Sequence, residues 1–343
     1  MAPSRLVCLV FLCASASGCF SLKYLGQAAA GEVEILHGAR PINEVLRDSE
    51  APPRVKALLI EVDAIKTWGR DRGLKPTRNY DRYVDLHRPA AAWIVQACAP
   101  LSFEVHRWHF PIVGSVPYLG FFSQAEARRF ADELAEREPL DVEVREADAF
   151  STLGWFRDPV LSTMLTDGDA GLGSLVNTIL HESVHATIYV RDQSAFNESL
   201  ASFVADRLTP VFLEERRGSG AREASAWVTA QHTREARVAR LRAAWLDLDG
   251  VYRSTATADE KRAQKQEILE ALRSDLGMTR LLNNASLAGF KTYATGTEVF
   301  ERLLSACEGS WSRFFAVLGR RAESGFAQPQ QEALEGVLPD RCE

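Results

Sequence analysis

Apolar residues recur every three to four positions in the first part of the chain. The stretch 53–74 shows this most clearly, because its apolar residues fall on one side of a helix with about 3.6 residues per turn. These residues are Val55, Leu58, Leu59, Val62 and Ile65. We therefore predict amphipathic helices across residues 22–74, each with one face to bury.

A different pattern begins near residue 101. Residues 101–122 mix β-favouring side chains with prolines and glycines, which predicts short strands joined by tight turns. Residues 140–150 alternate apolar and charged side chains, as a half-exposed strand does. Between these segments, Ser123 followed by Glu126 is typical of a capping box at the start of a helix.

Helical patterns return after this region. Asp158 and Pro159 are typical of an N-cap and a first helical residue, so a helix is predicted there. An apolar helix follows over 175–190. A second apolar helix begins near Asn197 and is predicted to end at Pro210, because proline interrupts helical hydrogen bonding.

These patterns predict an α+β fold that is mostly helical. We expect a zincin-like metallopeptidase core with a small mixed or antiparallel sheet and additional N- and C-terminal helices. The charged residues of 221–275 lie beside regular apolar positions, which favours a solvated helix pair over a binding arm. The predicted organisation is a signal peptide at 1–18 and one domain at 19–343. Its expected parts are N-terminal helices at 19–100, a strand-rich part at 101–157, zinc-site helices at 158–218 and a helical part at 219–343.

Composition narrows the possible partners. The chain has 343 residues and a formal net charge of −6, which argues against a nucleic-acid-binding surface. Its 46% hydrophobic and 25% charged residues are typical of a globular protein with enough apolar surface to form a core.

The first 19 residues have the composition of a secretion signal. One basic residue, Arg5, precedes a short apolar run and then small residues, and the run is too short to span a bilayer. The sequence Ala16-Ser17-Gly18-Cys19 resembles a bacterial lipoprotein signal, in which the cysteine carries lipid. By that resemblance Phe20, in place of aspartate, indicates the outer membrane, facing the periplasm. Ordinary cleavage at a small residue is the alternative.

Three cysteines remain outside this segment. They are Cys98, Cys307 and Cys342, and no two of them have CxxC spacing. An exported protein can form a disulfide, and Cys307 with Cys342 is the favoured pair by sequence distance. Buried free cysteines are the alternative.

The apolar helix at 175–190 carries the sequence HESVH. His181 and His185 are four residues apart, so both imidazoles lie on one helical face and can bind one ion. Glu182 lies beside them, as in the H-E-x-x-H motif, where two histidines bind zinc and the glutamate acts on water. Two histidines packed in a core are the alternative interpretation.

A hydrolytic zinc site needs a third protein ligand and an open fourth position. The metzincin extension is absent, because Ile188 and Arg191 stand where glycine and histidine would be required. Glu198 is the best candidate. If the first helix ends near Val190 and the next helix returns antiparallel after a short turn, Glu198 comes back to the level of His185.

These residues also carry a family resemblance. HESVH with NESLA resembles the glutamate zincins, the thermolysin-like metallopeptidases. Five segments in order resemble a bacterial family of predicted aminopeptidases, many with lipoprotein signals; they are FPIVGSVPYLGFF, FSTLGWFRDPVLSTML, ILHESVHATIYV, FNESLASFV and LNNASLAGFKTYATG. The resemblance implies Zn²⁺ held by His181, His185 and Glu198, with Glu182 as catalytic acid/base, and a peptide substrate.

The chain departs from the glutamate zincins in three respects, and the first is a shorter spacing between His185 and Glu198 than in thermolysin or the large alanyl aminopeptidases. It lacks the Gly-Met-Glu-Asn motif by which the large alanyl aminopeptidases hold a free amino terminus. Ser202 also stands where thermolysin-like sites place an aspartate that orients a histidine, and Asp206 lies one turn further. The sequence therefore names no residue for aminopeptidase specificity and leaves the support of the histidines open.

We expect a lipid-anchored zinc metallopeptidase in which Glu182 is the general base. Tyr293, in the resembling C-terminal segment, is the candidate donor to the oxyanion; a buried structural tyrosine is the alternative. The competing hypothesis is a lipid-anchored binding or assembly protein with a structural zinc. Glu182 favours the enzyme, because a closed structural site usually has four protein ligands and no use for a carboxylate beside an open position.

Overall fold

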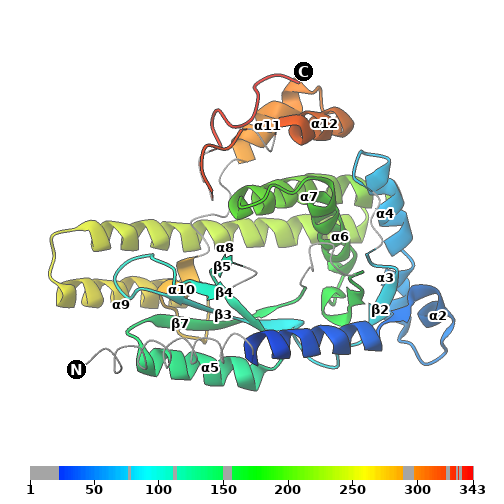
Figure 1. The fold of residues 1–343 in the computed structure, drawn as a ribbon. Helices are drawn as coiled ribbons and strands as arrows, with labels where there is room; N and C mark the ends of the chain where they lie inside the picture. The colour runs from blue at the N-terminus through cyan, green and yellow to red at the C-terminus, as the bar shows by residue number, and fades with distance from the viewer. Residues whose placement is uncertain are drawn as a thin grey trace, which may run out of the picture.

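A computed structural model describes most of the chain. The described residues are 23–75, 79–110, 114–149, 157–288, 297–321, 325–329, 331 and 334–342. The signal segment, Cys19 and Tyr293 lie outside these ranges. The described part is mostly helical with small sheets, which confirms the predicted α+β class (Figure 1).

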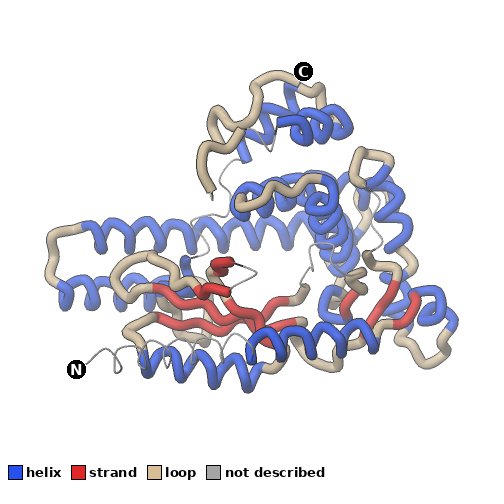
Figure 2. Tube along the Cα trace, viewed as in Figure 1, coloured by secondary structure: helices blue, strands red, loops and turns tan. Residues whose placement is uncertain are grey.

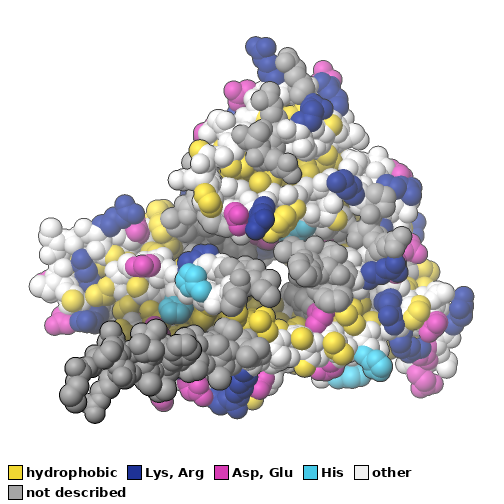
Figure 3. Space-filling model, in the orientation of Figure 1, with side chains coloured by type: hydrophobic (Ala, Val, Ile, Leu, Met, Phe, Trp, Pro, Cys, Tyr) yellow, Lys and Arg dark blue, Asp and Glu magenta, His cyan; other side chains and the backbone are white. Residues whose placement is uncertain are grey.

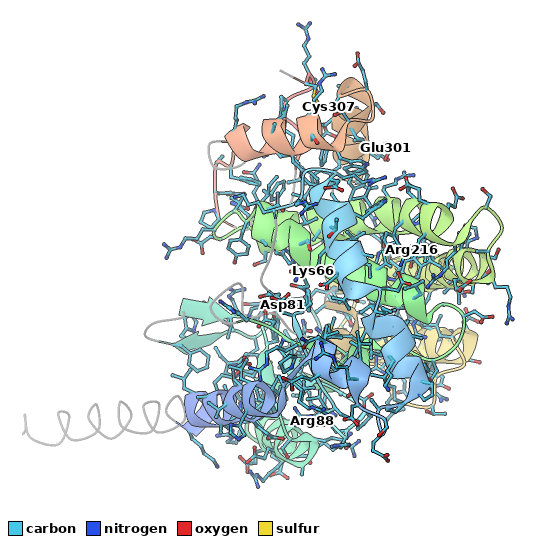
Figure 4. All side chains as sticks on the ribbon, turned by 90° about the vertical axis from the view of Figure 1, so that its right-hand side faces the viewer. Lys66, Asp81, Arg88, Arg216, Glu301 and Cys307 are labelled. Carbon is cyan, nitrogen blue, oxygen red and sulfur yellow. A yellow bond between two sulfur atoms is a disulfide. The ribbon has the colours of Figure 1, made fainter. Side chains whose placement is uncertain are left out.

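Helices dominate the N-terminal region, as predicted. Residues 23–38 form one helix, and α2 (Ile42–Arg47), α3 (Pro53–Leu59) and α4 (Val62–Arg70) follow. Val62 and Ile65 are fully buried, so the apolar face of α4 is the one the pattern predicted. Lys66 of α4 pairs with Asp81, which attaches α4 to the segment before the next strand (Figure 4).

The central sheet has three antiparallel strands in the order β6-β3-β7. Their bounds are β3 (Ala92–Cys98), β6 (Leu119–Phe121) and β7 (Asp141–Ala147). Helix α5 (Gln124–Arg137) packs on this sheet, and the 23–38 helix lies beside α5 in Figure 1. The hairpin of β4 (Trp108–Phe110) and β5 (Gly114–Val116) completes the strand-rich region (Figure 2).

The sequence analysis found β6, β7 and the β4–β5 hairpin but not the central strand. In β3 nearly every residue is buried, on both faces of the sheet. Such a strand has no apolar–polar alternation to reveal it. For this reason the sequence analysis assigned residues 19–100 to helices alone, whereas this segment also contains β3. Ser123 does cap α5, because its hydroxyl accepts the Glu126 N–H.

The predicted helix at Asp158–Pro159 is wrong. The chain forms β8 (Val160–Leu161) and a 3₁₀ turn (Ser162–Met164) instead. Strand β8 pairs in parallel with β2 (Arg82–Val84), which also pairs with β1 (Arg40–Pro41). Asp158 does not cap a helix, because it is buried and its side chain accepts a hydrogen bond from Asn79 Nδ2 at 3.2 Å.

Two adjoining helices form the centre of the molecule. They are α6 (Gly171–Thr187) and α7 (Ser194–Arg217). Helix α7 continues through Pro210, so the predicted end at this proline is wrong. Phe212 and Leu213, just beyond the proline, are buried in the main apolar cluster. Their burial offsets the hydrogen bond that proline cannot donate.

The predicted helix pair at 221–275 is present as a long hairpin. It consists of α8 (Arg222–Arg253) and α9 (Ala258–Asp275). Thr257 and Glu260 form a reciprocal capping box at the start of α9. The short helix α10 (Asn284–Ala288) is buried against β3 and β7, so it connects the hairpin to the sheet.

The C-terminal region lies against α7. Helices α11 (Thr297–Ala306) and α12 (Trp311–Arg321) lie at the top of Figure 1, and Cys307 is bonded to Cys342. The favoured disulfide is therefore present, and Cys98 is buried and free.

The three largest apolar clusters of the described residues stabilise this arrangement. The largest joins the inner faces of α4, α6, α7, α11 and α12. The second lies between the central sheet and α5, and the third lies within the α8–α9 hairpin. On the face shown in Figure 3, charged side chains of both signs are dispersed over the described residues, in keeping with the small net charge. Among those residues, none of the helices has both the length and the apolarity needed to span a membrane.

Candidate metal centre

Helix α6 buries one face and presents its histidines on another. Ile179, Leu180 and Val184 are buried in the main cluster, while the side chains of His181 and His185 are 21% and 8% exposed. The two groups follow from the sequence, because residues three or four positions apart, such as Leu180 with Val184 and His181 with His185, lie on the same side of a helix. The core therefore fixes the rotation of α6, and this rotation directs both imidazoles to the same place.

Glu198 reaches the histidines from the start of α7. Helix α6 ends at Thr187, three residues before the end predicted from the sequence, and α7 begins at Ser194. The antiparallel return places Glu198 Oε2 at 3.4 Å from His181 Nε2 and Glu198 Oε1 at 3.5 Å from His185 Nε2. The two Nε2 atoms are 3.2 Å apart. The structure thus brings all three predicted ligands together.

The dimensions of this triangle can be compared with those of a metal site. Zinc binds histidine nitrogen at about 2.0–2.1 Å and carboxylate oxygen at about 2.0–2.2 Å, usually in a tetrahedron. Two donors of such a tetrahedron are about 3.3–3.5 Å apart. The three separations, 3.2, 3.4 and 3.5 Å, agree with this value. The donor set therefore fits a tetrahedral ion that has one position open.

Glu182 lies beside the same histidines. Each of His181, Glu182 and His185 has a potential ligand atom, and these atoms lie within 4.8 Å of one another. Two carboxylates therefore compete for the role of third ligand. Glu198 is the better candidate, because its oxygens come within 3.4–3.5 Å of both Nε2 atoms. Glu182 is turned about 100° from His181 around the helix, so it does not lie in line with the two histidines.

The electrostatics of the site favour metal-binding protonation states. Burial and the neighbouring His181 lower the pKa of His185 to about 4, although Glu198 opposes this shift. Burial raises the pKa of Glu198, but the His181 hydrogen bond and the charges of both histidines outweigh it, so the net pKa is lowered. The Glu198 side chain is 53% exposed, which limits the effect of burial. Neutral imidazole and ionised carboxylate are the forms that bind metal.

Asn197 was missed as a site residue by the sequence analysis. Its side chain is 2% exposed and hydrogen-bonds to both backbone groups of Val190, across the turn between α6 and α7. This clamp attaches the first turn of α7 to the segment after α6, and Glu198 is the next residue. The sequence does show an asparagine directly before Glu198. Its contact with Val190 could not be predicted without knowing the shape of the turn between α6 and α7.

The sequence analysis did not decide whether Ser202 or Asp206 orients a histidine of the site. Asp206 accepts hydrogen bonds from Asn177 and Gln231, each at 2.9 Å, and therefore connects α6, α7 and α8. Within the described part of the chain, His185 Nδ1 is buried and has no hydrogen-bond partner. The described residues therefore orient the His185 ring by packing against it and not by a hydrogen bond to Nδ1.

The remaining predicted residues are not brought to the site by the described structure. Tyr293 and Cys19 lie outside the described residues, as does the whole STLGWF segment at 151–156. His109 is exposed on β4, and His106 packs edge-on against Trp108.

Fold and site together define a mostly helical α+β protein with a His-Glu-His candidate metal site on one helix and a glutamate from the next helix. Comparison with known families then assigns the chain to one of them. The family model described as "Putative aminopeptidase" matches residues 23–333, and the chain belongs to this family. No curated protein and no solved structure matches the chain significantly.

Proposed function

We propose that this protein is a zinc-dependent peptidase whose metal ligands are His181, His185 and Glu198. The observation that carries the proposal is the donor triangle, with separations of 3.2, 3.4 and 3.5 Å. Three protein ligands leave one coordination position open, as catalytic zinc sites do. A closed structural site would call for a fourth protein ligand, which makes the binding-protein alternative less favourable.

Glu182 is the proposed general base. When bound, zinc would supply Lewis-acid chemistry by acidifying water and polarising a carbonyl. Glu182 removes the proton of the attacking water and delivers it to the leaving nitrogen. Its position one step round the helix from His181 lets it serve the open position without occupying it.

Peptides with a free amino terminus are the proposed substrates. The family description supports a peptidase that acts at the amino end of a chain. The proposed location is the outer membrane, facing the periplasm, with lipid attached to Cys19. The support for this location is the lipoprotein-like segment Ala16-Ser17-Gly18-Cys19.

The test compares the zinc-loaded parent with Glu182→Gln on a panel of peptides with free and N-terminally blocked ends. Glutamine keeps the shape and polarity of the side chain but cannot accept the proton. We expect unchanged zinc stoichiometry and a kcat lower by at least about 100-fold, the usual scale of a lost general base. Equal rates for the two proteins on the best peptide would overturn the mechanism and leave a structural zinc as the better explanation.

A further inference from the structure

The turn between α6 and α7 is in contact with the C-terminal tail, by which we mean the described residues of 325–342. Gln193, which directly precedes α7, is 4% exposed. Its Nε2 donates to the Gln328 carbonyl at 2.7 Å, and its Oε1 accepts the Gln331 N–H at 2.9 Å. One buried glutamine side chain thus joins the turn to backbone groups 135 and 138 positions later in the sequence.

The backbone of Gln193 belongs to the hydrogen-bonded turn that precedes Glu198. Its N–H donates to the Val190 carbonyl at 3.3 Å, and its carbonyl accepts the Asn197 N–H at 3.0 Å. The Asn197 side chain in turn bonds to both backbone groups of Val190. Gln193, Val190 and Asn197 are therefore bonded to one another directly before the third proposed ligand. The tail is attached to this closed set through the Gln193 side chain.

Apolar packing adds to the contact between the tail and the turn. The ring of Phe326 meets the fully buried ring of Phe196, in the first turn of α7, edge-on at a centroid distance of 5.1 Å. Leu334, Val337 and Leu338 are buried in the main apolar cluster. Burial of apolar side chains is favourable, so the tail is a part of the core beside the candidate metal centre.

A disulfide closes the far end of the tail. Cys307, directly after α11, is bonded to Cys342, 35 positions later (Figure 4). Arg302 of α11 also pairs with Glu335 of the tail at 2.7 Å. A cross-link restricts the conformations that a detached chain can explore, so the bonded tail returns to its contacts more readily. Without the bond, the tail would be joined to the molecule covalently at one end only.

We propose that the C-terminal tail positions Glu198 through Gln193, and that the disulfide between Cys307 and Cys342 holds the tail in place. Gln193 is a positioning residue, which acts through the turn. A thiol reductant breaks the S–S bond by supplying two electrons and two protons, which leaves two cysteine thiols and oxidises the reductant to a disulfide. Metal affinity at the site therefore depends on the state of this bond. The inference rests on the metal ligands of the proposed function and adds a regulation of that site.

Gln193→Ala tests the contact between the tail and the turn. The variant loses the two hydrogen bonds to the tail, and we expect its zinc affinity to fall by about tenfold in competition titrations with a chelator. Asn283→Ala is the matched control. It also loses two side-chain hydrogen bonds to backbone groups, but its partners are Val142 in β7 and Ser286 in α10. Its zinc affinity should equal that of the parent.

A double variant, Cys307→Ser with Cys342→Ser, tests the disulfide. We expect its zinc affinity to be lower than that of the parent by at least about fivefold, the lower range of coupling between two sites. A phosphine reductant, which is oxidised to its oxide with oxygen from water, should lower the affinity of the parent to the same value. The phosphine should leave the double variant unchanged. Cys98→Ala, which keeps the disulfide, should bind zinc as the parent does.

Hydrogen exchange gives a measurement that a general loss of stability would not imitate. Coupling between two sites is reciprocal, so zinc binding should protect the tail if the tail strengthens zinc binding. In the parent, we expect zinc to slow exchange in peptides that contain Gln331, whose N–H donates to Gln193. In Gln193→Ala this effect of zinc on the tail should be lost. Melting temperatures show whether each variant is folded.

The outcomes separate this inference from the proposed function. Parent-like zinc affinity in folded Gln193→Ala, or tail exchange that ignores zinc in the parent, overturns the positioning role. Parent-like affinity in the double variant overturns the role of the disulfide. If Gln193→Ala does not fold, the phosphine titration of the parent still measures the coupling.

Peptide hydrolysis by the same proteins completes the comparison. A parent that binds zinc with this coupling but hydrolyses no peptide keeps the positioning role and loses the peptidase function. A parent that hydrolyses peptides while its variants bind zinc equally well keeps the function and loses the positioning role. A parent that binds no zinc overturns both.

Discussion

The side chain of Asn197 closes on the backbone of Val190 through two hydrogen bonds. Asn197 Oδ1 accepts the Val190 N–H at 2.9 Å, and Asn197 Nδ2 donates to the Val190 carbonyl at 2.8 Å. Because Glu198 follows Asn197 directly, this clamp fixes where the third proposed ligand enters the site. The metal centre is therefore built as much by the turn between α6 and α7 as by the helices.

Asn197→Ala should weaken zinc binding without removing a ligand. The substitution leaves the buried Val190 backbone groups unbonded and frees the start of α7, so Glu198 loses its fixed position. We expect zinc affinity to fall by about 10–100-fold in competition titrations with a chelator. Asn177→Ala, which breaks a hydrogen bond to Asp206 instead, is the control. Equal zinc affinities for the two variants would contradict a positioning role for Asn197.

Glu198→Ala should remove a ligand outright. We expect the purified variant to contain little zinc and its affinity to fall by more than the loss caused by Asn197→Ala, because one of three protein donors is gone. Helical content measured by circular dichroism should stay close to that of the parent. Glu214→Ala, at an exposed position of the same helix, provides the control. Full zinc occupancy in Glu198→Ala would show that another residue completes the site.

The metal-free protein should become less stable in mild acid because of His185. Its pKa is about 4 in the folded protein and 6.5 in the unfolded chain, so the unfolded state binds more protons between these values. Stability is therefore fully present above pH 6.5 and is lost as the pH falls toward 4.

Urea titrations at several pH values measure this loss. One proton changes the free energy of unfolding by at most about 1.4 kcal/mol per pH unit. His185→Gln should show a shallower pH dependence than the parent across this window. Parallel curves for the two proteins would mean that His185 does not contribute to the acid sensitivity.

Cys19→Ser should release the protein from membranes. If lipid on Cys19 is the anchor, the parent partitions into detergent and stays with membranes in high salt, while the variant is found in the soluble periplasmic fraction. Ser17→Ala, in the same segment, should behave as the parent does. A variant that remains bound at high salt would require a different anchor.

Local signals in the sequence were enough to find the candidate ligands. His181 and His185 follow from a fixed spacing on one helix, and Glu198 follows from a short turn and an antiparallel return. The residues in each of these inferences are fewer than about 20 positions apart in the sequence. Over such a distance, helix geometry determines which side chains can come into contact. The disulfide between Cys307 and Cys342 was favoured by the same kind of reasoning and is present.

Contacts between residues far apart in the sequence could not be predicted from such local signals. Asp158 has the sequence context of an N-cap, but its partners are Asn79 and Tyr80, almost 80 residues earlier. The central strand β3 was missed because it is buried on both faces, and α7 continues through Pro210 because tertiary packing outweighs a local preference.

The presence or absence of the bond between Cys307 and Cys342 shows whether the chain matured in an oxidising or a reducing compartment. Once the bond has formed, Cys98 is the one thiol left among the described residues, and burial raises its pKa to about 12, so it reacts slowly with alkylating reagents. A molecule that matured in an oxidising compartment should leave all three of these sulfurs unlabelled. One that was retained in a reducing compartment should take up label at Cys307 and Cys342. Mass spectrometry of labelled cells therefore distinguishes the two populations without fractionation.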